Sequence, residues 1–121
     1  MKCCVLLMAV LLAAPAAAQD DLTYDSMRQQ MDAKGCVPKD YAGYTVFTCD
    51  KEQADYYFTS PEHAAAPAVV KRFLNRDVAT ETWWSFGGDQ AALTKWLDQF
   101  HRMDRLAPRR WPLQAELPPP R

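Results

Sequence analysis

The chain has few of the residue types that build catalytic and metal sites. It contains two histidines and four cysteines, and two of those cysteines lie in an apolar N-terminal run. No serine stands in a G-x-S-x-G or S-x-x-K motif, and the sequence has no C-x-x-C pair. A zinc site needs three or four ligands, which so few histidines and cysteines do not supply. The sequence therefore predicts no cofactor and no metal.

The chain also lacks an excess of charge of either sign. Fourteen lysine and arginine residues stand against fifteen aspartate and glutamate residues, which gives a formal net charge of −1. Proteins that bind nucleic acid usually carry a strongly basic surface. The four arginines of residues 105–121 form only a short basic end. Nucleic acid is therefore excluded as the expected partner.

No apolar run is long enough to cross a bilayer, which takes about 20 residues. The longest run, residues 3–14, follows Lys2 and precedes three alanines at residues 16–18. A positive start, a short apolar run and small residues together predict a secretory signal peptide over residues 1–18. We expect the remaining chain to be periplasmic or secreted, with no transmembrane anchor after cleavage.

Export leaves two cysteines, Cys36 and Cys49, and two cysteines can pair with each other in one way only. A bridge between them closes a loop of about 14 residues, worth on the order of 3 kcal/mol in the chain-entropy model. A redox or metal pair would need C-x-x-C spacing or neighbouring histidines. The sequence therefore predicts a Cys36–Cys49 disulfide.

Two segments have the apolar spacing of helices. Residues 20–34 can begin at Asp20 or Asp21 and end at Gly35. The second helix follows Asp89, and its apolar stripe should end near Leu106, before a proline.

Between these helices, β-branched and aromatic residues predict strands. The expected strands are residues 44–49, 54–59, 68–75 and 78–86, with loops at 37–43 and 60–67. Residues 68–75 also fit a short helix. The sum is an α+β domain over residues 19–106, in which both helices cover one face of an antiparallel sheet of about four strands. The proline-rich tail, residues 107–121, should be extended or disordered.

His63, next to Glu62 in the 60–67 loop, is the one weak candidate for a catalytic group. A histidine beside a carboxylate can act as a general base or bind a metal. Catalysis also needs a nucleophile and an orienting partner, and the sequence points to neither. The alternative is a histidine that is structural or merely exposed.

Aromatic residues on the strands are the stronger candidates for a binding site. If Tyr57 and Trp83 share an uncovered face of the sheet, they form an aromatic platform for a glycan or a partner protein. The alternative is that a loop or the tail covers them, for example through Trp111. Tyr57, Trp83 and His63 are therefore the predicted binding residues.

Two motifs in the middle of the chain are similar to a known group of proteins. F-T-x-P-x-H (residues 58–63) and P-x-V-V-K-R (residues 67–72), with W-S-F at 84–86, resemble small exported bacterial proteins of no assigned function. The resemblance spans about residues 49–100 and implies a periplasmic or secreted bacterial protein. The loop of that group carries a second histidine near the position of Ala66, so the difference weakens a metal or catalytic role for His63.

The function these observations favour is a small, non-catalytic binding module of the bacterial envelope. An inhibitor, an immunity-like protein or an envelope accessory that binds another envelope protein or a glycan would fit. The alternative is a small hydrolase or transferase centred on His63 and Glu62. In a third hypothesis, residues 107–121 dock the protein onto a larger assembly.

Overall fold

The computed structural model describes residues 22–105 and 110–119. The predicted signal peptide therefore lies outside the described residues. The elements in chain order are α1 (Tyr24–Ala33), β1 (Val37–Tyr41), β2 (Tyr44–Cys49), β3 (Ala54–Thr59), β4 (Ala68–Asn75), β5 (Val78–Ser85) and α2 (Gln90–Asp104). The predicted α+β class is confirmed, with five strands in place of about four.

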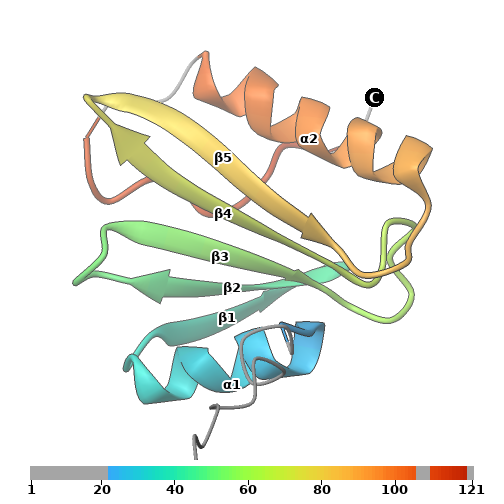
Figure 1. Ribbon diagram of the computed structural model, residues 1–121. Coiled ribbons are helices and arrows are strands. Elements are labelled where there is room, and N and C mark those ends of the chain that lie inside the picture. The colour runs from blue at the N-terminus through green and yellow to red at the C-terminus, as the bar shows by residue number, and fades with distance from the viewer. Residues whose placement is uncertain (1–21, 106–109, 120–121) are drawn as a thin grey trace, which may run out of the picture.

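The strands form one antiparallel sheet in the order β1-β2-β3-β4-β5 (Figure 1). The additional strand is β1, which we expected to be a loop because its sequence contains Pro38 and Asp40. A proline is tolerated in an edge strand, where its missing N–H need not serve a second neighbour. Residues 68–75 form β4, and Arg76 and Asp77, both at positive φ, make the tight turn into β5.

The two helices lie on opposite faces of the sheet, which corrects the expectation that both cover one face (Figure 1). Side chains alternate along a strand, so each strand supplies residues to both layers. The α1 layer contains Met27, Met31, Cys36, Phe47, Cys49, Ala54, Tyr56, Phe58 and Val69. The α2 layer contains Tyr44, Val46, Tyr57, Ala65, Ala68, Val70, Leu93, Trp96, Leu97, Phe100, Met103 and Leu117.

The α1 layer is closed by a helix that is fixed at both ends. α1 is capped by Thr23, whose side chain accepts the Ser26 N–H, and so begins later than expected. The helix ends at Ala33, and Gly35 follows its C-cap residue at a φ of +70°, which suits glycine. The Cys36–Cys49 disulfide then joins this end of the helix to the end of β2. The predicted disulfide is confirmed.

The described part of the C-terminal segment, residues 110–119, has no regular secondary structure but is not a solvated tail. Leu113 and Leu117 are buried, and the Tyr57 hydroxyl donates a hydrogen bond to the Ala115 carbonyl (2.6 Å). Prolines prevent regular structure, yet an extended chain can still bury leucines and offer its carbonyls to donors. This segment covers Tyr44 and Tyr57 of β2 and β3 on the face that also carries α2.

None of the helices among the described residues is both long and apolar enough to span a membrane.

Candidate binding site

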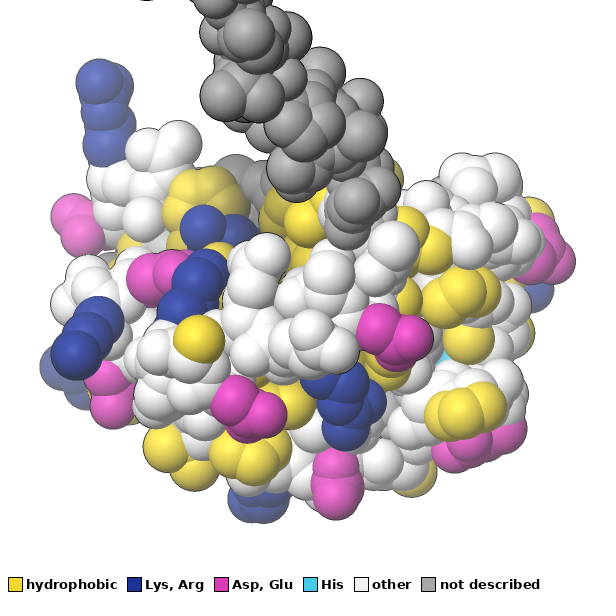
Figure 2. Space-filling model, turned by 60° about the horizontal axis from the view of Figure 1, so that its bottom comes forward, with side chains coloured by type: hydrophobic (Ala, Val, Ile, Leu, Met, Phe, Trp, Pro, Cys, Tyr) yellow, Lys and Arg dark blue, Asp and Glu magenta, His cyan; other side chains and the backbone are white. Residues whose placement is uncertain are grey.

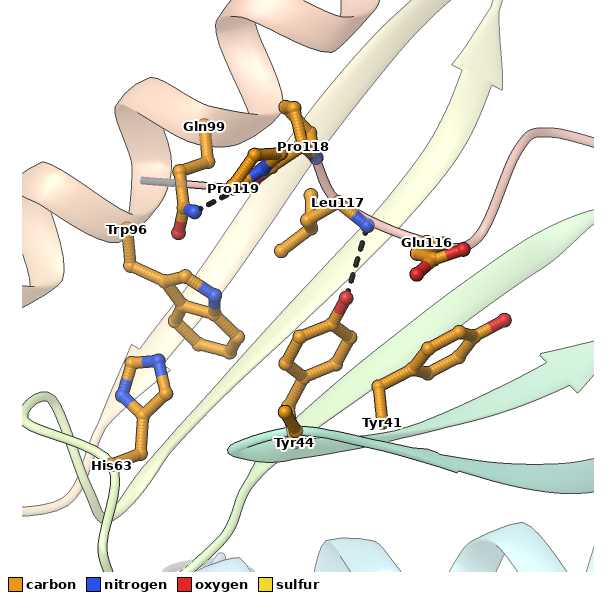
Figure 3. A pocket seen from close by; sticks show the side chains of 10 residues that line it. Tyr41, Tyr44, His63, Trp96, Gln99, Glu116, Leu117, Pro118 and Pro119 are labelled. Carbon is orange, nitrogen blue, oxygen red and sulfur yellow. Dashed lines mark hydrogen bonds between the residues drawn. The ribbon is translucent and has the colours of Figure 1, made fainter. Parts of the chain in front are cut away.

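A cavity of about 430 Å³ opens on the α2 side of the sheet (Figure 3). Aromatic rings and prolines make up most of its wall. The lining residues are Tyr41, Ala42, Tyr44, His63, Trp96, Gln99, Glu116, Leu117, Pro118 and Pro119. Ligand pockets in proteins typically have this size range and combine apolar walls with a few polar groups. The cavity is therefore a candidate binding site.

Short backbone contacts fix the loop that carries His63. The Ser60 N–H donates to the carbonyl of Gly43, in the turn between β1 and β2, at 2.9 Å. Within the loop, the His63 N–H donates to the Ser60 carbonyl at 2.9 Å. These bonds hold the β1–β2 turn and the 60–67 loop together, so Tyr41 and His63 reach the same cavity from different elements.

Gly88 fixes the other side of this loop. A Cβ atom at Gly88 would lie far inside contact distance of the Ala65 and Ala66 carbonyl oxygens. Glycine at the start of the segment leading into α2 thus lets the loop backbone pack directly on it. The position of His63 depends on this close approach.

His63 is a neutral hydrogen-bond donor in this setting. Its Nδ1 accepts the Ala65 backbone N–H at 3.0 Å, so the ring proton of the neutral form is on Nε2. Burial lowers the pKa of His63, although the charge of Glu62 acts in the opposite direction. The imidazole ring also lies 4.7 Å from the ring of Trp96, centroid to centroid. At neutral pH the side chain therefore offers Nε2–H to a ligand.

Trp96 forms the back of the cavity and has an unused donor. It lies on the apolar stripe of α2, is 2% exposed, and its ring packs 5.3 Å from that of Phe100. Its Nε1–H has no hydrogen-bond partner among the described residues. In Figure 3 the indole nitrogen lies on the edge that faces Leu117 and Tyr44. A buried donor left unpaired costs about 1–3 kcal/mol. The nitrogen is enclosed, so a ligand oxygen reaches it only where a neighbouring side chain moves aside.

Two tyrosines on neighbouring strands form the opposite wall. The rings of Tyr41 and Tyr44 stack, with centroids 5.3 Å apart and planes 18° apart. The Tyr44 hydroxyl accepts the Leu117 backbone N–H at 3.0 Å, and burial raises the pKa of Tyr44. Gln99 of α2 donates to the Pro118 carbonyl at 2.9 Å. Side chains of the domain thus hold the C-terminal segment against the cavity by its backbone.

The predicted aromatic platform does not form. Tyr57 pairs with Val70 and Val70 with Trp83, so Tyr57 and Trp83 do share a face of the sheet. That face is covered by α2 and by the C-terminal segment, and Tyr57 is fully buried. Burial also raises the pKa of Tyr57. Tyr57 is therefore a core residue, because the tail that we expected to be extended or disordered covers it.

Trp83 is 48% exposed on β5, but it is not among the residues that line the cavity of about 430 Å³. Trp111, which we considered as a cover for these aromatics, donates its Nε1–H to Asp50 instead. Of the three predicted binding residues, only His63 lies in the cavity.

A polar row across the sheet was missed by the sequence analysis. Thr48, Asp55, Arg72 and Glu81 are direct neighbours on β2, β3, β4 and β5. Asp55 is 1% and Arg72 0% exposed. Both residues stand at inward-pointing positions in strands whose side chains alternate between the two faces of the sheet. This alternation was the signal that could have revealed them.

Arg72 connects this row to α2 and to the C-terminal segment. Its Nε and Nη2 lie 2.8 and 2.6 Å from Asp104 Oδ1, and Nη1 donates to the Gln114 carbonyl at 2.7 Å. Burial raises the pKa of Asp55 to about 6, although Thr48 and Arg72 oppose the change. Burial and the neighbouring Asp104 together raise the pKa of Glu81 to about 8.

The face that carries α1 is different in character. In Figure 2, basic and acidic side chains are interspersed there, and apolar side chains appear in separate small groups. Lys34 and Glu52 form an ion pair of 2.7 Å on this part of the molecule. Neither the basic nor the acidic side chains form a separate patch of one charge in that view, so it shows no charged binding surface.

Among the described residues, no group of three or more histidine, cysteine, aspartate or glutamate side chains is arranged to hold a metal ion. Neither a family model, nor a curated protein, nor a solved structure matches this chain. The resemblance to small exported bacterial proteins therefore stays a prediction, and the geometry of the site carries the functional argument.

Proposed function

We propose that this chain is an exported binding module of a bacterial envelope and that it recognises its partner at the aromatic cavity. The observation that carries the proposal is the convergence of Tyr41, His63 and Trp96 on one cavity. They come from β1, a loop and α2. His63 offers its Nε2–H, and the enclosed Nε1–H of Trp96 is left without an acceptor in the described chain. Another envelope protein or a glycan would supply the acceptor oxygens.

Two features support an extracytoplasmic location, periplasmic or secreted. The Cys36–Cys49 disulfide is of a kind that persists mainly in oxidising compartments. Residues 1–18 have the pattern of a signal peptide. A small domain that needs to stay folded outside the cell gains from such a bridge.

The geometry around His63 favours binding over hydrolysis. A catalytic histidine needs a nucleophile on one ring nitrogen and an orienting acceptor on the other. Here Nδ1 receives a backbone N–H, and the ring makes no side-chain hydrogen bond within the described residues. Glu62 is exposed and acts on His63 only through its charge.

The test is native mass spectrometry of the protein purified from its own host. We expect the wild type to retain a partner protein or glycan, and Tyr41→Ala to lose it. Trp83→Ala is the matched control, because Trp83 is an exposed aromatic residue that does not line the cavity. Loss of the partner in Trp83→Ala with retention in Tyr41→Ala would move the site to β5 and contradict the proposal.

A further inference from the structure

We infer that the aromatic cavity is part of a groove for extended, proline-rich peptide segments, and that residues 116–119 occupy part of it as an internal ligand. The inference rests on the proposed binding function and specifies the chemistry of the partner. It identifies the partner as a protein with an exposed proline-rich stretch.

The chain's own C-terminal segment shows how the groove holds such a peptide. The Leu117 side chain is 8% exposed, and its backbone N–H is bound by the Tyr44 hydroxyl. The next carbonyl, of Pro118, accepts from Gln99, while Pro118 and Pro119 line the cavity (Figure 3). Aromatic grooves that hold the backbone through side-chain donors and acceptors are a recurrent way of recognising proline-rich segments. Such segments lose little entropy on binding, because proline already restricts them.

The groove continues beyond the part that the C-terminal segment reaches. A second cavity, of about 420 Å³, shares His63, Trp96 and Gln99 with the first and extends along α2 to Asp89. None of residues 110–119 is among the residues that line it. A partner segment longer than the internal one would therefore gain contacts that the internal one does not make.

The internal ligand also leaves a donor of the groove unsatisfied. Trp96 Nε1–H has no partner among the described residues, and Leu117, whose side chain is apolar, lines the same cavity. An external peptide that places a backbone carbonyl there would gain a hydrogen bond. His63 Nε2–H, at the boundary between the two cavities, offers a second donor to the same peptide.

Residues 116–119 and an external peptide should compete for the groove, because residues 116–119 are covalently tethered to it by the chain. A tethered segment is present at an effective concentration in the millimolar range, so it lowers the apparent affinity for an external peptide. Weakening the internal ligand should therefore strengthen external binding, while a change in the groove itself should weaken it. A segment that was only part of the core would show neither relation.

The experiment titrates a capped peptide with the sequence of residues 114–119 into the full mature chain. The reporter is the indole N–H signal of Trp96 in a ¹H–¹⁵N spectrum, assigned with Trp96→Phe. We expect a saturable shift whose apparent Kd is lower by about 10-fold or more in Leu117→Asp than in the wild type. A peptide with alanine in place of leucine and both prolines is the control, and we expect no shift from it.

The inference is overturned if folded Leu117→Asp gives no saturable shift, if both proteins bind equally, or if the alanine peptide binds as well. Pro118→Ser combined with Pro119→Ser weakens the internal ligand in a second way, should Leu117→Asp not fold. If the native complex depends on Tyr41 but the peptide does not bind, the proposed binding function stands, and only the assignment of the partner as proline-rich is wrong. If the native complex does not depend on Tyr41, the proposed function itself is contradicted.

Discussion

The two layers on either side of the sheet are closed in different ways. The α1 layer is covered by one helix whose end is bonded covalently to β2 through Cys36 and Cys49. The α2 layer is covered by a helix and by an extended segment. The segment is held to the strands by hydrogen bonds donated by Tyr57 and Arg72 and by one that Tyr44 accepts. Only the second cover is made of two separate pieces.

The polar groups follow the same division. Asp55, Glu81 and Trp96 each have a buried side-chain atom without a hydrogen-bond partner in the described chain, and all three residues lie on the α2 side. Buried polar groups of this kind reduce stability, and in proteins they often mark functional sites. The unpaired polar groups thus lie in the layer that carries the proposed binding cavity, and the covalent link lies in the other layer.

The largest effect is expected from Arg72→Ala. Removing the guanidinium leaves Asp104 and Asp55 without their buried cation and releases the Gln114 carbonyl. Losing one partner of a buried ion pair costs about 3–5 kcal/mol, measured as the free energy of unfolding in urea. Arg72→Met combined with Asp104→Leu is the control and should lose less, because it leaves no single unpaired charge at that contact. Equal losses would contradict the role of the ion pair.

The next effect concerns the α1 layer. Replacing Cys36 and Cys49 together by serine should lower the free energy of unfolding by about 3 kcal/mol, since the unfolded chain is no longer cross-linked. Partner or peptide binding at the cavity should be unchanged below the unfolding transition. Binding that falls along with stability would show that the two layers are not independent.

A smaller effect is expected where the C-terminal segment docks. Tyr44→Phe removes the acceptor of the buried Leu117 N–H, and an unpaired buried donor costs about 1–3 kcal/mol. Faster hydrogen exchange should be confined to residues 110–119 and the β2 strand. Tyr41→Phe removes a hydroxyl from the neighbouring stacked ring and is the matched control. The same change in exchange for both variants would rule out the hydroxyl contact as the cause.

The smallest effect is expected from a dependence on pH, because Glu81 is only half-buried and water screens its charge. The ordinary pKa of Glu81 is 4.5, and burial beside Asp104 raises its pKa to about 8, although Arg72 opposes this. The folded chain holds a proton that the unfolded chain has released, so stability is full below about pH 4.5 and falls as the pH rises toward 8. Glu81→Gln should flatten this fall, which thermal unfolding at pH 5 and pH 8.5 would measure. Glu116→Gln, at an exposed position, should leave the wild-type slope unchanged.

Most of the fold could be predicted from the sequence because local patterns specify it. Alternation over residues 54–59 places Tyr57 and Tyr56 on opposite faces, and the stripe of α2 places Trp96 inward. β1 was missed because loop-forming residues occur in an edge strand. The covering of the two faces depends on contacts between distant segments, which periodicity does not encode.

The site was less predictable for the same reason. His63 stood out as a rare residue beside a carboxylate, but its actual neighbours are Trp96 and the Ala65 backbone. Trp96 looks like any core residue of an amphipathic helix, and its unpaired Nε1–H is visible only in three dimensions. The prediction that Tyr57 lies on the surface was wrong, because residues 110–119 fold back over it.

The division between the layers is tested most directly by hydrogen exchange of the native complex and of the free protein. The account predicts that bound partner protects the β1–β2 turn, the 60–67 loop and the half of α2 that carries Trp96, while α1 exchanges as in the free protein. Protection concentrated in α1 and around the disulfide, with the cavity unchanged, would contradict it.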